Sequence, residues 1–235
     1  MRAVILAGGS GTRLRPQTAT RPKPLLPLGG ELPVLDVALR RMAHAGVRRV
    51  TLAVSHLHEL VMAHAADGAR WGLAIDYVID ERPLGTAGPL AMIRDLPETF
   101  VVMNGDVLSD LDPRVLLAAH AAAGNDVTVA VSRMRTVLDV GVVRYDADGR
   151  LRELVEKPVL EHDVSMGIYA VSRAMVERLP RAEPAGFDRM LRDGLARGDR
   201  LGVLPHAGVW LDIGTPDSYR RANASWGELR GRLLP

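Results

Sequence analysis

Short β-branched apolar runs alternate with helix-like segments through the first half of the chain, and this alternation constrains the fold more than any other feature. Strands are predicted over residues 2–7, 48–55, 73–80, 99–106 and 126–132. Helices are predicted between them, over 33–46, 57–69, 86–95 and 113–124. Such alternation is typical of a mostly parallel sheet with helices on both faces. We therefore expect an α/β protein with a Rossmann-like, doubly wound sheet.

The pattern changes after residue 135, where strands come closer together. Runs over 140–146 and 150–156 flank the turn Ala-Asp-Gly and predict a hairpin at a mixed sheet edge. The remaining elements are a strand over 164–171, helices near 172–179 and 187–197, strands near 201–205 and 209–213, and a helix from Pro216. No linker-like run or internal repeat divides the sequence, so we expect one domain over 1–235.

Composition excludes several classes of function. The chain has 30 basic and 28 acidic residues, and its formal charge of +2 is too small to indicate nucleic-acid binding. It has no cysteine, which excludes disulfides, thiolate metal ligands and cysteine nucleophiles. A strand predicted from Arg2 leaves no room for a signal peptide, and no apolar run approaches the roughly 18 residues of a membrane span. We expect a cytoplasmic protein without a membrane partner.

A glycine-rich loop follows the first predicted strand and carries four cations. The glycines are Gly8, Gly9 and Gly11, and the cations are Arg13, Arg15, Arg21 and Lys23. Glycines let main-chain N–H groups approach a phosphate, and this loop lies at the carboxyl edge of a doubly wound sheet, where ligands bind. The loop has no Gly-Lys-Ser/Thr and lacks the last glycine of a dinucleotide fingerprint. It predicts a polyphosphate site of another kind.

Residues 6–30, LAGGSGTRLRPQTATRPKPLLPLGG, resemble the signature of the sugar-1-phosphate nucleotidyltransferases. The resemblance continues in order through segments 83–96, 103–106, 155–158, 167–172 and 208–219. It therefore covers nearly the whole chain. It implies the nucleotidyltransferase fold, with a nucleotide-binding half over 1–135, a sugar-phosphate-binding half over 136–235, and no C-terminal β-helix domain.

The resemblance implies a reaction between a nucleoside triphosphate and a sugar 1-phosphate. A phosphate oxygen of the sugar phosphate would attack the α-phosphorus in line and release pyrophosphate, so catalysis is mostly positioning and charge neutralisation. Arg13, Lys23 and Asp106 are the implied catalytic residues. The implied nucleotide-binding residues are Leu6, Ala7, Gly8, Gly9, Gly11, Thr12, Arg13, Lys23, Gly85, Thr86 and Asn104.

The same resemblance implies a metal site and an acceptor site. Asp106 and Asp212 would hold Mg²⁺, which prefers a few carboxylates together with substrate oxygens. The implied sugar-phosphate residues are Asp106, Gly141, Glu156, Lys157, Ser165 and Gly167. Ser165 stands where many members of the family have Asn, so the identity of the sugar is the least constrained part of the prediction.

Lysine usage singles out two positions. The chain has 28 arginines and only two lysines, Lys23 and Lys157, and each lysine precedes a proline. A residue before proline favours an extended backbone, which we expect for Lys157. Lysine delivers a compact charge on a slim stem, whereas arginine presents a broad planar fork. We interpret both lysines as phosphate ligands, Lys23 for the nucleotide and Lys157 for the sugar phosphate.

Several alternatives stay open. Segment 80–96 resembles the branch that makes GDP-mannose or GDP-heptose, which favours GTP over UTP, dTTP or CTP. A non-catalytic regulatory subunit is disfavoured because the charged residues of the implied site are all present. A nicotinamide-dependent oxidoreductase would need the full glycine fingerprint and an acidic residue where Ser55 stands. The oligomeric state is open, a homo-oligomer included.

Two further patterns are given structural interpretations. His56, His58 and His64 lie close in sequence, but no carboxylate or fourth ligand has matching spacing, so we do not predict a metal site there. Asp112 precedes Pro113, and this pair predicts a helix N-cap followed by proline at the first helical position.

Overall fold

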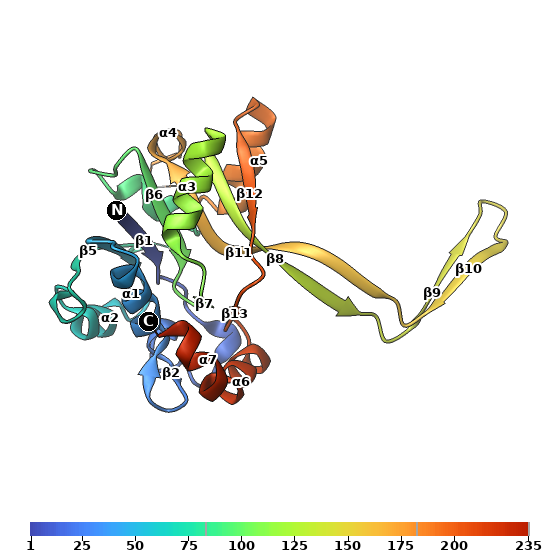
Figure 1. The fold of residues 1–235 in the computed structure, drawn as a ribbon, viewed down its shortest axis with the longest axis horizontal. Coiled ribbons are helices and arrows are strands. Elements are labelled where there is room, and N and C mark those ends of the chain that lie inside the picture. Colours follow the sequence, from blue (N-terminus) through green and yellow to red (C-terminus); the bar gives the residue numbers. More distant parts are fainter. Residues whose placement is uncertain (83, 182, 235) are drawn as a thin grey trace.

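A seven-stranded sheet lies at the centre of the computed structural model, which describes residues 1–82, 84–181 and 183–234 (Figure 1). In spatial order its strands are β12 (Leu201–Pro205), β8 (Val127–Val137), β11 (Val159–Ser172), β6 (Thr99–Asn104), β1 (Arg2–Leu6), β4 (Arg49–Val54) and β5 (Ala74–Ile79). The pairings of β11 are antiparallel, and all other pairings in this sheet are parallel. The predicted α/β fold with a mostly parallel, mixed sheet is confirmed.

Helices cover both faces of the sheet. They are α1 (Val34–His44), α2 (His58–Ala65), α3 (Pro113–Ala123), α4 (Arg173–Glu177), α5 (Phe187–Arg197), α6 (Pro216–Ala224) and α7 (Trp226–Leu233). Alternate side chains of β1 point to opposite faces, so Ala3 and Ile5 join the cluster under α1, α2 and α3, whereas Val4 joins the cluster under α4 and α5. None of the helices within the described ranges is both long and apolar enough to cross a membrane.

The antiparallel strand β11 lies inside the sheet, between β8 and β6, so the prediction of a mixed sheet edge was wrong. The physical reason is burial on both faces. Ile168 and Ala170 pack into one apolar cluster and Tyr169 and Val171 into the other. A continuous apolar run of this kind suits an interior strand rather than an edge.

Other boundaries also differ from prediction. The helix expected over 86–95 is a short 3-10 helix, Gly88–Met92. The final helix divides into α6 and α7. Three-residue strands β7 (Val107–Ser109) and β13 (Trp210–Asp212) pair with each other, and β2 (Pro27–Leu28) pairs with β3 (Leu32–Pro33). Elements this short carry too little periodicity to be predicted from sequence.

Strands β8 and β11 continue beyond the sheet as a two-stranded ribbon, and Figure 1 shows it projecting away from the rest of the molecule. The predicted hairpin, β9 (Gly141–Tyr145) and β10 (Leu151–Glu156), is confirmed and stands at the far end of this ribbon. We call residues 132–164 the arm. Since β8 is parallel to β6 and β1 through their shared neighbours, the arm leaves the sheet at its carboxyl edge.

The C-terminal helices pack against the segment that follows the glycine-rich loop. A third apolar cluster joins Leu28 and Val34 to Ile213 and Trp226. The Tyr219 hydroxyl donates a hydrogen bond to the Pro27 carbonyl at 2.6 Å. These contacts bring two segments that are distant in sequence to the same edge of the sheet.

Candidate active site

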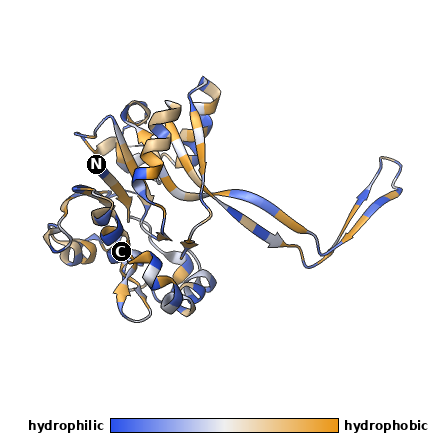
Figure 2. Ribbon diagram, viewed as in Figure 1, coloured by the Kyte–Doolittle hydropathy of each residue, from blue (hydrophilic) through white to orange (hydrophobic). Residues whose placement is uncertain are grey.

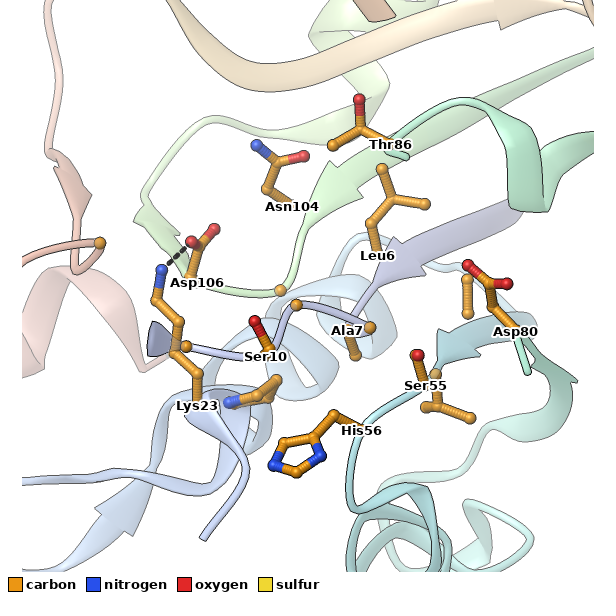
Figure 3. Close-up of a pocket in the computed structure, with 18 of the residues that line it drawn as sticks. Leu6, Ala7, Ser10, Lys23, Ser55, His56, Asp80, Thr86, Asn104 and Asp106 are labelled. Atoms are coloured by element: carbon orange, nitrogen blue, oxygen red, sulfur yellow. Dashed lines mark hydrogen bonds and ion pairs between the residues drawn. The ribbon is translucent and has the colours of Figure 1, made fainter. Parts of the chain in front are cut away.

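A cavity of about 640 Å³ opens at the carboxyl edge of the parallel strands (Figure 3). Leu6 at the end of β1, Val54 at the end of β4 and Asn104 at the end of β6 all line it. Cavities of this size hold small-molecule ligands, and this edge is where doubly wound sheets bind them.

The glycine-rich loop forms one wall of the cavity. Gly11 has a φ of +62°, which glycine adopts without strain, and a Cβ at this position would lie 2.9 Å from Thr18 Cγ2. The Thr18 hydroxyl donates a hydrogen bond to the Gly11 carbonyl at 2.7 Å. The turn is therefore fixed by close packing that a larger residue would disrupt. Every residue predicted to bind nucleotide lines this cavity: Leu6, Ala7, Gly8, Gly9, Gly11, Thr12, Arg13, Lys23, Gly85, Thr86 and Asn104.

Lys23 and Asp106 meet inside the cavity. Lys23 Nζ forms a hydrogen-bonded ion pair with Asp106 Oδ2, drawn as a dashed line in Figure 3. The side chain of Lys23 is only 10% exposed and that of Asp106 is 25% exposed. A lysine cation is thus held in a crowded site beside a predicted metal ligand.

The second predicted metal ligand, Asp212, lines the same cavity. The pairing of β7 with β13 sets Asp212 opposite Val107, and the Ile213 N–H donates to the Asp106 carbonyl at 3.1 Å. Asp212 Oδ1 accepts a hydrogen bond from the Gly214 N–H at 2.6 Å. Two short strands therefore bring the two carboxylates to one wall of the cavity.

The donor set fits Mg²⁺ better than a metal held by protein ligands alone. In residues 1–82, 84–181 and 183–234, no group of three or more His, Asp or Glu side chains is arranged to hold an ion. Mg²⁺ is bound through one or two carboxylates and completes its coordination with phosphate oxygens and water. Asp106 and Asp212 supply carboxylates of that number and kind.

The sequence analysis did not name every residue that lines the cavity. The additional residues are Ser10, Pro24, Ala53, Val54, Ser55, His56, Asp80, Pro89, Gly105 and Gly214. Asp80 is buried, and its carboxylate accepts hydrogen bonds from the Leu84 N–H at 2.9 Å and the Arg82 N–H at 3.2 Å. It thereby supports the turn that presents Gly85 and Thr86. The available signal was its position at the end of a predicted strand, which Asp106 shares.

Ser165 and Gly167 lie at the root of the arm and border the cavity through Asn104. A Cβ on Gly167, whose φ is +70°, would lie 2.5 Å from Asn104 Nδ2. Ser165 Oγ lies 3.1 Å from the Tyr169 hydroxyl and accepts a hydrogen bond from the Gly167 N–H at 3.3 Å. The structure thus places Gly167 beside Asn104, a residue that lines the cavity.

The other predicted sugar-phosphate residues stand out on the arm, at the corner where the ribbon of β8 and β11 meets the hairpin of β9 and β10. Gly141 and Glu156 pair across β9 and β10, and Lys157 Nζ lies 2.5 Å from Asp139 Oδ1. None of Gly141, Glu156 and Lys157 lines the cavity of the same chain. The structure therefore does not bring these three residues together with the glycine-rich loop of the same chain.

The backbone of Lys157 is not extended, so that prediction was wrong. Its φ is +46°, in the left-handed region. Lys157 occupies the corner between β10 and β11, where its N–H donates to the Val140 carbonyl at 3.3 Å and the Leu138 N–H donates to the Pro158 carbonyl at 3.0 Å. These hydrogen bonds across the corner outweigh the local preference of a residue that precedes proline.

The predicted N-cap of α3 is confirmed, and two of the three neighbouring histidines contact carboxylates. Asp112 accepts a hydrogen bond from the Arg114 N–H at 2.8 Å and caps α3, with Pro113 at its first position. His64 Nε2 lies 2.5 Å from Asp36 Oδ1. The His58 ring lies beside Glu59. These histidines therefore take part in local pairs rather than in a shared ligand set.

Comparisons with known proteins agree with this geometry. The chain is 37% identical over 227 residues to "Mannose-1-phosphate guanylyltransferase catalytic subunit beta" of Danio rerio, a match that covers 93% of this chain and 62% of that protein. It is 37% identical over 229 residues to a mannose-1-phosphate guanylyltransferase of Mycobacterium tuberculosis, covering 94% and 63%. The chain thus spans about three fifths of the length of the curated relatives it matches.

Solved structures show the same fold. One is a Bacillus anthracis protein assigned as a glucose-1-phosphate thymidylyltransferase, with a TM-score of 0.76, 26% identity and coverage of 95% of this chain and 94% of that one. HddC from Yersinia pseudotuberculosis has a TM-score of 0.75, 23% identity and coverage of 96% and 99%. The nucleotidyl transferase family model matches residues 2–228. Because that match takes in nearly the whole chain and the fold agrees, the protein belongs to the nucleotidyl transferase family.

Proposed function

We propose that this chain transfers a nucleotidyl group from a nucleoside triphosphate to a sugar 1-phosphate, forming a nucleotide sugar and pyrophosphate. One observation carries the proposal. The glycine-rich loop, both of its predicted catalytic cations and both predicted metal carboxylates line a single cavity at the carboxyl edge of the sheet. A site of this composition suits the joining of two phosphate-bearing substrates.

The proposed reaction breaks one bond and forms one. A phosphate oxygen of the sugar 1-phosphate attacks the α-phosphorus, and the bond from that phosphorus to the oxygen bridging to the β-phosphorus breaks, so that pyrophosphate leaves. Main-chain N–H groups of residues 8–12 hold the triphosphate. Arg13 and Lys23 stabilise the charge that develops on the leaving pyrophosphate.

Mg²⁺ is part of this proposal. Asp106 and Asp212 would hold it, and when bound it would neutralise negative charge on the phosphate oxygens. Lys23 already contacts Asp106, so this lysine and the ion would share one carboxylate. The arrangement keeps positive charge beside Asp106 with and without the ion.

We propose GTP as the nucleotide and a mannose-type or heptose-type sugar 1-phosphate as the acceptor. The similarity to proteins named mannose-1-phosphate guanylyltransferase supports this choice. The similarity in fold to a protein assigned as a thymidylyltransferase keeps dTTP as the main competitor. The relative from Danio rerio is named a catalytic subunit, and the charged residues of the cavity are all present here, which favours an enzyme over a regulatory subunit.

Pyrophosphate release tests the proposal. The purified protein is incubated with Mg²⁺, each of GTP, dTTP, UTP, CTP and ATP, and mannose, heptose or glucose 1-phosphate in turn. We expect release with GTP and a mannose-type or heptose-type acceptor, and loss of release when EDTA removes the metal. Absence of pyrophosphate from every pair would overturn the proposal, and a preference for dTTP would overturn the choice of base. The Asp106→Asn variant is the inactive control.

A further inference from the structure

The cavity of one chain holds little positive charge for two anionic substrates. The charged side chains lining it in the described ranges are the cations Arg13 and Lys23 and the carboxylates Asp80, Asp106 and Asp212. Each phosphate monoester brings a further 1.5 to 2 negative charges, roughly. Carboxylates already outnumber cations, Lys23 is engaged by Asp106, and the proposed Mg²⁺ would only offset the charge of Asp106 and Asp212. If the proposed function holds, the acceptor phosphate needs a further cation.

The arm carries a lysine suited to that task. Lys157 pairs with Asp139, and the two side chains are 56% and 82% exposed. An ion pair this exposed contributes little to stability, so Lys157 can exchange Asp139 for a phosphate at small cost. The resemblance in sequence makes this lysine a phosphate ligand, whereas the structure places it far from the cavity of its own chain.

The distance follows from the pairing of β8 with β11. The ladder runs without a register shift from the pair Val131 and Ser165 to the pair Val137 and Val159. Six residues of strand span about 20 Å at roughly 3.3 Å per residue, and Lys157 lies beyond that end. Reaching the cavity of the same chain would require the ribbon to fold back on itself and break this ladder.

Backbone pairing holds the ribbon together along its length, and exposed ion pairs flank it. Arg133 Nε lies 2.7 Å from Asp163 Oδ1, and Arg135 Nε lies 3.0 Å from Glu161 Oε1. The register shift in this pairing lies between Ser165 and Tyr169, at the root of the arm. The irregular pairing bends the strands at the root of the arm, whereas the pairing from Val131 to Val137 is regular.

The arm also exposes apolar surface of the kind that is buried in interfaces. More than half of the large apolar side chains exposed in the described ranges lie within it, and hydrophobic segments, orange in Figure 2, recur along the ribbon. They are Met134, Val137, Val140, Val143, Tyr145, Leu151, Leu154, Val155, Val159 and Leu160. An isolated two-stranded ribbon is marginally stable in water, and exposed apolar patches of this kind mark interaction surfaces.

We propose that two copies of this chain exchange arms about a two-fold axis, so that Lys157 of each copy serves the cavity of the other. If the axis crosses the ribbons of β8 and β11 near their middle, the ribbons run side by side in opposite directions. The corner of one arm, with Lys157, then lies at the root of the other, where Gly167 adjoins Asn104. The same contact covers the apolar side chains of both arms, as a self-complementary interface must. The acceptor site is incomplete in a single copy.

Subunit complementation distinguishes a shared site from a site within one chain. Lys157→Ala removes the cation on the arm. Asp106→Asn disables the residues that line the cavity, which we call the body of the site. Each variant alone is expected to be inactive. When the two are co-expressed, a mixed dimer joins an intact body to an intact arm at one of its two sites. Random pairing then restores about a quarter of the wild-type activity, because about half of the dimers are mixed.

A matched pair of variants controls for this result. Asp106→Asn and Lys23→Ala both change residues that line the cavity and are each expected to be inactive, so their co-expression should restore no activity. Restoration of activity in this control pair, or its absence from the pair that includes Lys157→Ala while the wild-type protein is active, would overturn the exchange.

A second readout does not depend on activity. The natural chain has no cysteine, so Lys157→Cys in one tagged copy and Ser10→Cys in a copy with a different tag can be joined by a short bismaleimide. Ser10 is exposed and lines the cavity. We expect a cross-linked species that contains both tags, and a dimer by sedimentation. Cross-linking between tags in a protein that releases no pyrophosphate would retain the arm exchange and reject the proposed function. A monomer, or cross-linking only within a chain that carries both cysteines, would overturn the exchange.

Discussion

Lys23 Nζ and Asp106 Oδ2 form an ion pair that joins residues 83 positions apart in sequence. The pair ties the end of the glycine-rich loop to the segment that follows β6, and both side chains are mostly shielded from solvent. Lysine fits there because its charge sits at the end of a slim stem. The shape of the cation therefore matters as well as its charge.

Replacing Lys23 by arginine is predicted to reduce turnover although it preserves the charge. The planar guanidinium is wider than an ammonium and would displace Asp106 or the triphosphate. We expect Lys23→Arg to lower kcat by roughly 100-fold, as loss of one positioned transition-state contact does. Initial rates of pyrophosphate release measure the effect. Arg192→Lys, a charge-preserving change on the exposed face of α5, should leave the rate unchanged. Equal rates for Lys23→Arg and the wild type would contradict the prediction.

Asp212→Asn is predicted to weaken the binding of Mg²⁺, and so to raise the Mg²⁺ concentration that activity requires, without unfolding the protein. The amide oxygen of asparagine can still accept the hydrogen bond from Gly214, so the turn is preserved. We expect the Mg²⁺ concentration for half-maximal activity to rise about tenfold or more, which corresponds to about 1.4 kcal/mol of lost binding. A Mg²⁺ titration measures it. Asp217→Asn, on an exposed helical position, serves as the control, and an unshifted titration for Asp212→Asn would exclude its role as a ligand.

Asp80→Ala is predicted to raise the KM for the nucleotide more than it lowers kcat. The change leaves the Leu84 and Arg82 N–H groups without their acceptor and loosens the turn that presents Gly85 and Thr86. Leu84 is buried, and leaving its N–H unsatisfied costs about 1–3 kcal/mol. Steady-state kinetics with varied triphosphate separate the two effects. Asp67→Ala removes a similar bond, to Ala69, at an exposed turn and should change neither constant. A fall in kcat alone would show that Asp80 does not act through the turn.

Gly167→Ala is predicted to destabilise the protein more than Gly149→Ala does. Both glycines have positive φ values, of +70° and +78°, so each alanine variant loses about 1–2 kcal/mol through its backbone. A Cβ at Gly167 would also collide with Asn104, whereas a Cβ at Gly149 meets nothing within 4 Å. We expect Gly167→Ala to lose at least about 1 kcal/mol more in urea unfolding. Equal losses would show that the contact with Asn104 yields without cost.

His120 is predicted to make stability fall as the pH drops below 6.5. Burial lowers the pKa of His120 from its ordinary value of 6.5, although Asp126 opposes the shift. The unfolded chain therefore takes up the proton first, and stability that is fully present above pH 6.5 is lost as the pH falls towards the folded-state pKa. Its ring nitrogens lie 3.0 Å from Thr128 Oγ1 and 3.2 Å from Ser172 Oγ.

Urea unfolding at about pH 7.5 and about pH 5.5 measures this dependence. The His120→Gln variant should lose less stability between the two pH values than the wild type, even if it is less stable at both. An identical loss in the two proteins would assign the acid sensitivity to other groups.

The sequence predicted the central strands well, and the residues it singled out around the glycine-rich loop line one cavity, for physical reasons. Strands such as β1 and β6 are buried on both faces and read as continuous apolar runs. Their carboxyl ends must share one edge, which places Asn104 and Asp106 beside the glycine-rich loop. These relationships are local or follow directly from topology.

The arm could not be predicted in the same way. Apolar and polar residues alternate along 141–156, as in a hairpin. This alternation distinguishes the two faces of the hairpin, but it does not show whether either face packs against a sheet or projects into solvent. The position of Lys157 depends on how far β8 and β11 continue, and that extension is set by backbone pairing between the two strands. Pairing between segments distant in sequence leaves no local signal.

The packing of the C-terminal helices against the loop after Lys23 fixes when the site can form during synthesis. Asp212 completes the cavity nearly 200 residues after Arg13. At roughly 5–20 residues per second, a ribosome needs about 10–40 s to cross that interval. The nascent chain therefore carries its glycine-rich loop without the opposing carboxylate throughout that interval. Under the proposed function, nucleotide binding at full strength can begin only after residues 210–214 have emerged from the ribosome.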